Sequence, residues 1–329
     1  MSEESSEIVA EAEKAVEELA AVKEEIDRAV FGQERVVELS LSAVLAGGHA
    51  LLIGAPGLAK TRLVEAMSTA LGLDGARIQF TPDLMPSDIL GSEVLDEAPS
   101  GARSFRFLKG PIFTQLLMAD EINRASPRTQ SALLQAMQEK HVTVAGVAHE
   151  LPRPFHVLAT QNPIEQEGTY PLPEAQLDRF LLKIDVQYPD LDTERRILVE
   201  TTGSDDSEVN AALDGERLIA LQALVRRMPV GEKVLDTILA LVRAARPEQS
   251  EDDRVRRLVD WGPSPRAGQA LMLAARARAL LRGRLAPSIE DVEALAEPAL
   301  GHRMAMRYDP TGEAPGLGEL INDLARRAA

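Results

Sequence analysis

A glycine-containing loop between a short apolar run and a helical pattern has the residue types of a phosphate site. The loop reads Gly54-Ala-Pro-Gly57-Leu-Ala-Lys60-Thr61 and follows the apolar residues 50–53. The backbone amides of such a loop and the N-terminus of the next helix suit phosphate oxygens. Lys60 would neutralise the β- and γ-phosphates, and the Thr61 hydroxyl would ligate Mg²⁺.

This loop departs from the general pattern at one position. Ala59 precedes the lysine where the pattern has glycine, so Gly57 would have to supply the flexibility. The expected nucleotide contacts of the loop are Gly54, Ala55, Pro56, Gly57, Leu58, Ala59, Lys60, Thr61 and Arg62.

Two carboxylates follow a second apolar run, Leu116-Leu-Met-Ala-Asp120-Glu121. In a parallel sheet, ligands lie beyond the carboxyl ends of the strands. We therefore expect Asp120 to reach the Mg²⁺ shell and Glu121 to orient and polarise an attacking water. Alone, an Asp-Glu pair after an apolar run is also typical of a strand end and a helix cap. Together with the Lys60 loop, it indicates nucleotide hydrolysis.

Three further polar residues lie at element ends. Asn162 follows the apolar residues 155–159 and could sense the γ-phosphate or position the water; the alternative is a turn-forming residue before Pro163. Arg179 suits a developing phosphoryl charge, but could instead pair with a neighbouring acid, Asp178 or Glu174. Arg266 follows Ser264-Pro265 at a helix start, and we expect it to contact nucleotide.

The segment Phe31-Gly32-Gln33 precedes the apolar helix that leads to the first strand. Two interpretations of it stay open. It is either an ordinary helix start, or the backbone of Phe31 and Gly32 lies near an adenine base.

The elements that must position these residues alternate along the chain. Short apolar runs at 50–53, 77–80, 116–119, 155–159 and 181–186 are separated by helical patterns such as 60–71 and 126–139. This alternation predicts an α/β fold with a mostly parallel sheet covered on both faces. Residues 88–107 and 141–151 do not fit it, and we interpret each as a hairpin, the second with its bend near Ala145-Gly146.

Helical patterns occupy the rest of the chain. After Tyr188-Pro189 the strand signals end, and we expect helices at 193–201, 217–228, 234–245, 266–281 and 289–302. We therefore divide the chain into an α/β domain, residues 1–188, and an all-α domain, residues 189–329. The N-terminal segment is an amphipathic acidic helix with apolar positions Ile8, Ala12, Ala15, Leu19, Val22 and Ile26, whose charged face we interpret as solvated.

Composition limits the functions of the chain. Its 329 residues contain 36 basic and 52 acidic side chains, a net charge of −16, which disfavours nucleic acid and anionic lipid as partners. Cysteine is absent, which excludes disulfides, thiolate metal sites and thiol catalysis. The acidic start is unlike a secretory signal, and turn signals interrupt the long uncharged stretch 39–59. We expect a cytoplasmic protein without a transmembrane segment.

These motifs together resemble the MoxR family of AAA+ ATPases. The resemblance extends from Phe31-Gly32-Gln33 to Ser264-Pro265-Arg266 and is densest in Gly110-Pro-Ile-Phe, in Ala119-Asp-Glu-Ile-Asn-Arg124 and between Ala159 and Phe180. It implies a P-loop AAA+ αβα domain followed by an all-α lid. Residues 88–107 would be the helix-2 insert, and residues 141–151 the hairpin before sensor 1. Ala59 resembles the usual variant of this family.

The resemblance also implies roles and partners. Asn162 would be sensor 1, Arg179 the arginine finger and Arg266 sensor 2, with ATP and Mg²⁺ as cofactors. Such proteins form rings, usually hexamers, that act as chaperone-like remodellers. They often work with a von Willebrand factor A-domain partner in maturing enzymes or inserting metal cofactors. The alternatives are a nucleotide-gated scaffold, which would not need Glu121, and a DNA-translocating or magnesium-chelatase-like motor subunit, which the net charge disfavours.

Overall fold

A five-stranded parallel sheet forms the centre of the first domain. The computed structural model describes residues 3–97, 103–164, 168–201, 208–308 and 314–329. The strands, in the order β2-β5-β8-β1-β9, are β2 (Gly75–Gln79), β5 (Leu116–Asp120), β8 (His156–Gln161), β1 (Ala50–Ile53) and β9 (Leu182–Asp185). Every residue of β5 is buried, as expected for a parallel strand covered on both faces. The predicted parallel sheet is confirmed.

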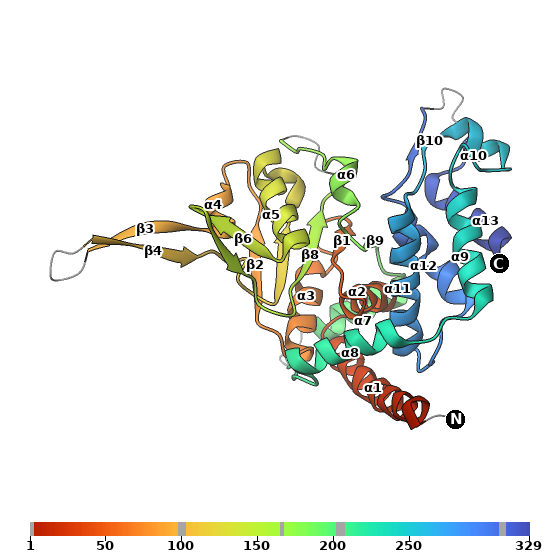
Figure 1. The fold of residues 1–329 in the computed structure, drawn as a ribbon, viewed down its shortest axis with the longest axis horizontal. Coiled ribbons are helices and arrows are strands. Elements are labelled where there is room, and N and C mark those ends of the chain that lie inside the picture. Colours follow the sequence, from red (N-terminus) through yellow and green to blue (C-terminus); the bar gives the residue numbers. More distant parts are fainter. Residues whose placement is uncertain (1–2, 98–102, 165–167, 202–207, 309–313) are drawn as a thin grey trace.

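Helices cover both faces of this sheet (Figure 1). Alternate residues of β1, Ala50 and Leu52, join a core with α1 (Glu3–Asp27), α2 (Glu34–Leu45) and α3 (Lys60–Ala70). Leu51, on the other face, joins a second core with α5 (Pro127–Glu139). Shorter helical turns complete the domain: α4 (Pro86–Leu90), η1 (Ile122–Arg124) and α6 (Glu174–Leu177).

Two hairpins interrupt the alternation, as predicted. Strands β3 (Gly91–Glu97) and β4 (Arg103–Lys109) form an arm that extends away from the body of the molecule (Figure 1), although residues 98–102 lie outside the described residues. Strands β6 (His141–Val144) and β7 (Val147–Glu150) form the second hairpin. Its bend is Ala145-Gly146, both with positive φ, as a two-residue turn between twisted strands requires.

The C-terminal part is helical. It contains α7 (Leu191–Thr201), α8 (Gly215–Arg227), α9 (Glu232–Ala244), α10 (Asp253–Leu258), α11 (Pro265–Leu281), α12 (Ile289–Leu300) and α13 (Leu317–Ala328). The expectation that strands end at Tyr188 is wrong, because β10 (Val259–Trp261) pairs with β11 (Ala305–Met306). These strands are too short to show a period. Helices α10 and α13 were not predicted either, and α13 buries Leu320, Ile321 and Leu324.

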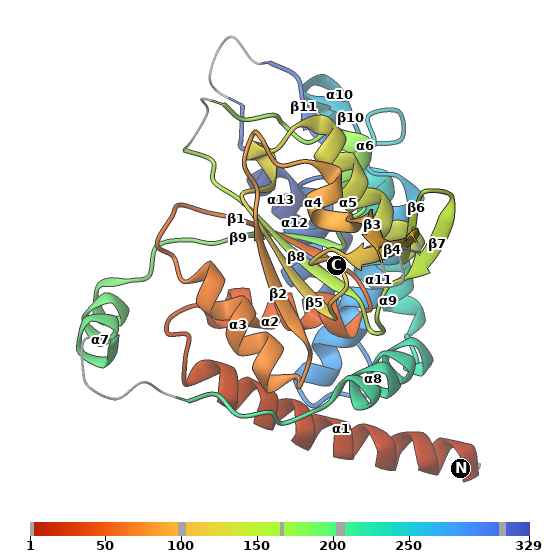
Figure 2. The ribbon, with the colours of Figure 1, turned by 90° about the vertical axis from the view of Figure 1, so that its left-hand side faces the viewer.

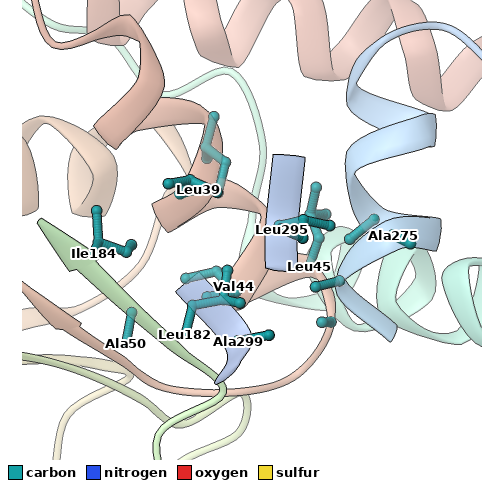
Figure 3. Close-up of a cluster of buried hydrophobic side chains, with 14 of the residues drawn as sticks. Leu39, Val44, Leu45, Ala50, Leu182, Ile184, Ala275, Leu295 and Ala299 are labelled. Carbon is teal, nitrogen blue, oxygen red and sulfur yellow. The ribbon is translucent and has the colours of Figure 1, made fainter. Parts of the chain in front are cut away.

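The lid packs directly against the sheet domain. Figure 3 shows Leu39, Val44 and Leu45 of α2 in one cluster with strand residues and with the lid residues Ala275, Leu295 and Ala299. The strand residues are Ala50, Leu182 and Ile184. Because this apolar core crosses the expected boundary at residues 188 and 189, that boundary stays a prediction.

The N-terminal helix is amphipathic, as predicted. Its buried positions are Ala12, Ala15, Leu19, Val22 and Ile26, while the side chain of Ile8 lies outside the described residues. Its acidic face is only partly solvated, because Glu11 binds Arg227 of α8 and Glu18 binds Arg217.

Candidate active site

The loop between β1 and α3 has the backbone shape of a phosphate loop. Gly57 has φ +83° and Ala59 has φ +54°, the left-handed region that favours glycine. Ala59 therefore adopts the conformation that explains glycine at this position in the general pattern. The Gly54 amide donates to the Gln161 carbonyl (3.2 Å), which ties the start of the loop to β8. Ala59 precedes the first turn of α3 without capping it through a side chain, and Thr61 lies in that turn.

Lys60 closes this loop. Its Nζ donates to the carbonyl oxygens of Gly54 (2.6 Å) and Ala55 (2.8 Å). Burial lowers the pKa of Lys60, and the nearby carboxylates of Asp120 and Glu121 oppose that shift. The lysine therefore lies within electrostatic reach of both acids that follow β5.

One hydroxyl joins the two carboxylate residues to the next strand. The Thr160 Oγ1 donates to Oδ1 of Asp120 (2.6 Å) and accepts from the backbone amide of Glu121 (2.9 Å). Asp120 is buried, and Glu121 has φ +55°, so the backbone turns sharply between these side chains. The expected cluster of Lys60, Asp120 and Glu121 at one sheet edge is formed.

Strand β2 contributes two residues to this cluster that were not predicted from the sequence. Arg77 donates to Oδ2 of Asp120 from Nη2 (2.5 Å) and Nε (3.2 Å). Gln79 donates from Nε2 to Oε2 of Glu121 (2.8 Å), and Arg124 donates to the same oxygen (3.0 Å). The available signal was that Arg77 and Gln79, two residues apart on a strand, share one face.

Asn162 makes the turn-forming contact that was one of its two predicted roles, and its role toward nucleotide or water stays a prediction. Its Oδ1 accepts from the Ile164 amide (3.1 Å), which is the turn-forming role around Pro163. It also borders a cavity of about 370 Å³ together with Ile53 and Gln161, at the carboxyl ends of β1 and β8. Asn162 thus lies at the same sheet edge as the Lys60 loop.

Arg179 and Arg266 lie near the end of the sheet at which the strands begin, whereas the Lys60 loop lies at the end at which they finish. β9 begins beside Ala50, the first residue of β1, whereas the Lys60 loop follows the last. Arg179, two residues after the end of α6, donates to the Leu134 carbonyl (2.5 Å). Figure 2 shows α3 and α6 on opposite faces of the sheet, each against a different apolar core.

Arg266 contacts the carboxylate of Asp178, which is the residue next to Arg179 in the sequence. Asp178 accepts from Nη1 of Arg266 (3.4 Å) and from Nε of the buried Arg303 (2.6 Å). Within the ranges that the structure describes, Arg179 forms no ion pair with Asp178 or Glu174, so that alternative is not realised. The structure therefore groups the two arginines with each other and not with the phosphate loop of the same chain.

The segment Phe31-Gly32 packs against the residues that follow β9. The guanidinium of Arg196 lies 4.7 Å from the Phe31 ring centre, and Gln33 donates to the Gln187 carbonyl (3.1 Å). Gly32 borders a cavity of about 710 Å³ between α2, the segment after β9 and the lid. The described residues that line this cavity do not come from the Lys60 loop, so the adenine role of Phe31 and Gly32 stays a prediction.

The residues present fit a magnesium–nucleotide complex better than a metal held by protein alone. Among the described residues, no group of three or more His, Asp or Glu side chains could hold a metal. Mg²⁺ usually takes one or two protein oxygens and completes its shell with phosphates and water. Thr61, in the first turn of α3 whose N-terminus has no side-chain cap, and Asp120 would supply such a pair of oxygens.

Comparison with known proteins agrees with this class of site. Residues 49–182 match the model of the ATPase family associated with various cellular activities (AAA), and residues 251–324 match the AAA lid domain. A crystal structure of a candidate ATPase from Cytophaga hutchinsonii superposes with a TM-score of 0.89 at 34% identity, covering 99% of this chain and 98% of that one. The fold is that of an AAA ATPase with its lid.

The family follows from the curated relatives. The chain is 41% identical over 306 residues to Chaperone MoxR1 of Mycobacterium tuberculosis, covering 93% of this chain and 80% of the relative. It is 33% identical over 304 residues to Protein MoxR of Paracoccus denitrificans, covering 87% and 88%. The chain belongs to the MoxR family of AAA+ ATPases. No described helix is long and apolar enough to span a membrane.

Proposed function

We propose that this chain binds ATP with Mg²⁺ at the loop Gly54–Arg62 and hydrolyses it to drive remodelling of partner proteins. The observation that carries the proposal is the Thr160 hydroxyl, which fixes Asp120 and Glu121 at the sheet edge that Lys60 shares. A binding scaffold without turnover would not need Glu121 placed in this way.

Each residue of the cluster has a task in this reaction. Backbone amides of the loop and Lys60 hold the phosphates, and Lys60 exchanges its carbonyl partners for phosphate oxygens. Thr61 and Asp120 would hold Mg²⁺, which supplies charge neutralisation when bound. Glu121 accepts the proton of the attacking water, and Asn162 orients that water or senses the γ-phosphate.

The arginines indicate an active site shared between subunits. Because Arg179 and Arg266 lie where β9 begins, and the Lys60 loop lies where β1 ends, we assign both arginines to the nucleotide of a neighbouring copy. This arrangement requires a neighbouring copy, and we propose that the copies form a closed ring of six, the usual number in the family. Phe31 and Gly32 remain our candidates for the adenine contact.

The biological role is proposed from the family. The similarity to Chaperone MoxR1 and to Protein MoxR supports a chaperone-like remodeller. We further propose that it acts in the cytoplasm. Its partners would be a von Willebrand factor A-domain protein and a client protein. The net charge of −16 still disfavours the DNA motor.

A lysine comparison tests the proposal. Wild-type protein should release phosphate from ATP at steady state in the presence of Mg²⁺. Lys60→Ala should lose nucleotide binding, while Lys14→Ala, at an exposed position on α1, should retain both binding and turnover. Unchanged nucleotide affinity in Lys60→Ala would refute the placement of the phosphates.

A further inference from the structure

We propose that a cavity at the start of β8 binds a small oxyanion with two or more negative charges, such as a phosphate-bearing or polycarboxylate metabolite. This cavity lies apart from the phosphate loop. Strand β8 begins at the cavity with His156 and ends with Gln161, whose carbonyl binds the Gly54 amide. Neither Arg179 nor Arg266 is among the described residues that line the cavity. The proposal therefore does not depend on the proposed ATPase activity.

The cavity has the size of a small-molecule site. Its volume is about 370 Å³, and ligand pockets usually measure about 300–1,000 Å³. Four separate segments line it: the turn before β1, the end of α5, the segment before β8 and helix α8. Three of its lining residues, Pro154, Phe155 and His156, are buried. A hollow of this size suits a small molecule, and the net charge of −16 disfavours a nucleic-acid strand.

The charged residues that line the cavity are all basic. They are Lys140, Arg153 and Arg226, each from a different segment, and no described acidic side chain lines it. Within the ranges that the structure describes, Lys140 and Arg226 form no ion pair, and Arg153 reaches Glu150 only at 4.0 Å. Three cations around one hollow create a local positive potential in a chain of net charge −16. An anion with two or more charges would neutralise them.

Helix α8 distinguishes Arg226 from its other two arginines. Arg217 and Arg227 each pair with an acidic residue of α1. Arg226 instead lines the cavity, where its Nη2 lies 3.7 Å from the point that a Cβ on Gly47 would occupy. The acids of α1 thus neutralise two arginines of α8, and the third remains available to an anion.

The position of Lys140 is unusual for a lysine. It follows α5 with φ +58°, in the left-handed region where glycine or asparagine usually ends a helix. A residue with a Cβ pays a conformational cost there. Burial lowers the pKa of His156 to about 4, and the charge of Lys140 adds to that shift. The field of Lys140 therefore reaches the buried side of the cavity.

The buried side of the cavity is itself uncharged. The Nδ1 of His156 donates to the Gly48 carbonyl (2.8 Å), since a carbonyl can only accept. Its Nε2 therefore accepts from the Gln222 amide (2.9 Å), which also donates to the Val44 carbonyl (2.9 Å). Both ring nitrogens are thus satisfied with a neutral imidazole. The positive charge of the site comes from its three exposed cations, which substitution can remove singly.

Calorimetric titration with two probes, pyrophosphate and citrate, tests the proposal. The full chain carries Lys60→Ala throughout, so that any contribution of the phosphate loop is the same in every comparison. Arg226→Ala and Lys140→Ala should each weaken the binding of at least one probe about tenfold, the loss expected when a charged hydrogen-bond partner is removed. Arg226→Lys keeps the charge and should retain most of the affinity. Binding of pyrophosphate alone indicates a phosphate-bearing ligand, and binding of citrate alone indicates a polycarboxylate.

A matched arginine provides the control. Arg243 lies in the last turn of α9, as Arg226 lies in the last turn of α8, and Arg243→Ala should leave the binding of both probes unchanged. No binding of either probe at millimolar concentration would overturn the proposal. Equal affinity in Arg226→Ala, Lys140→Ala and Arg243→Ala would also overturn it, because the anion would then bind elsewhere. Since no ATP is present, either negative result leaves the proposed function standing.

Discussion

The buried guanidinium of Arg303 donates to Oδ1 of Asp178 at 2.6 Å, which joins the lid to the segment that carries Arg179. The same guanidinium donates to the carbonyl oxygens of Phe180 (2.7 Å) and Leu181 (3.1 Å). The start of β9 is therefore held by the lid of its own chain. Arg266 donates to the other oxygen of Asp178 from a largely exposed position.

These two arginines should differ in their contribution to stability. Arg303→Ala should lower the free energy of unfolding by about 3 kcal/mol, because it breaks a buried ion pair with its hydrogen bonds. Arg266→Ala should lower it by less than about 1 kcal/mol, as is usual for exposed pairs. Urea unfolding of both variants measures the difference. Equal losses would contradict the anchoring role of Arg303.

The Thr160 hydroxyl should be required for activity as well as for stability. Thr160→Val keeps the side-chain shape but leaves Oδ1 of Asp120 and the Glu121 amide without this partner. We expect a loss of about 1–3 kcal/mol in the free energy of unfolding and slower phosphate release. Thr160→Ser keeps the hydroxyl and should preserve both. A fully active Thr160→Val would show that the hydroxyl does not position the carboxylates.

Three buried histidines should make stability fall in mild acid. Burial lowers the pKa of His49 and His302 to about 3 and that of His156 to about 4. In the unfolded chain each should titrate near its ordinary value of about 6.5. Below that value only the unfolded state binds the protons, so stability is complete above pH of about 6.5 and is lost as the pH falls toward about 4.

The expected loss is about 1.4 kcal/mol per histidine for each pH unit within that window. Urea unfolding between pH 7.5 and pH 5.5 checks this. His156→Gln should remove about one histidine's share of the pH dependence. A pH dependence identical to that of wild type would show that His156 is not held neutral in the folded state.

The shared site can be tested by mixing two inactive variants. Arg179→Ala should bind ATP through its intact Lys60 loop but hydrolyse it poorly. An arginine supplied by a neighbouring subunit can raise the rate of phosphoryl transfer by about 10³–10⁵-fold. Lys60→Ala should bind no ATP but still supply Arg179. Mixed rings should regain phosphate release at junctions that combine the two.

Co-purification of differently tagged chains must first show that mixed rings form. With mixed rings present and no regained hydrolysis, the assignment of Arg179 to a neighbour's nucleotide would be wrong. A purely structural Arg179, bonded only to the Leu134 carbonyl, would give this negative result.

The sequence predicted the parts of the site that are local in the chain. Strand β1, the Lys60 loop and the Asp120-Glu121 pair are contiguous motifs, and their apolar runs fix the strands that carry them. Arg77 and Gln79 could not be placed, because their roles depend on β2 lying next to β5, which no short motif encodes. The meeting of Arg266 with Asp178 likewise depends on how the lid packs.

The central claim, that Glu121 makes this chain an ATPase, is tested most directly by Glu121→Gln. The amide keeps the shape of the side chain but cannot accept the proton, so ATP binding should be retained while phosphate release falls by about 10²–10⁴-fold. Both quantities are measured on the same preparation, by calorimetric titration and by steady-state phosphate release. Retained binding with abolished release supports the account, and Glu121→Gln hydrolysing ATP near the wild-type rate would contradict it.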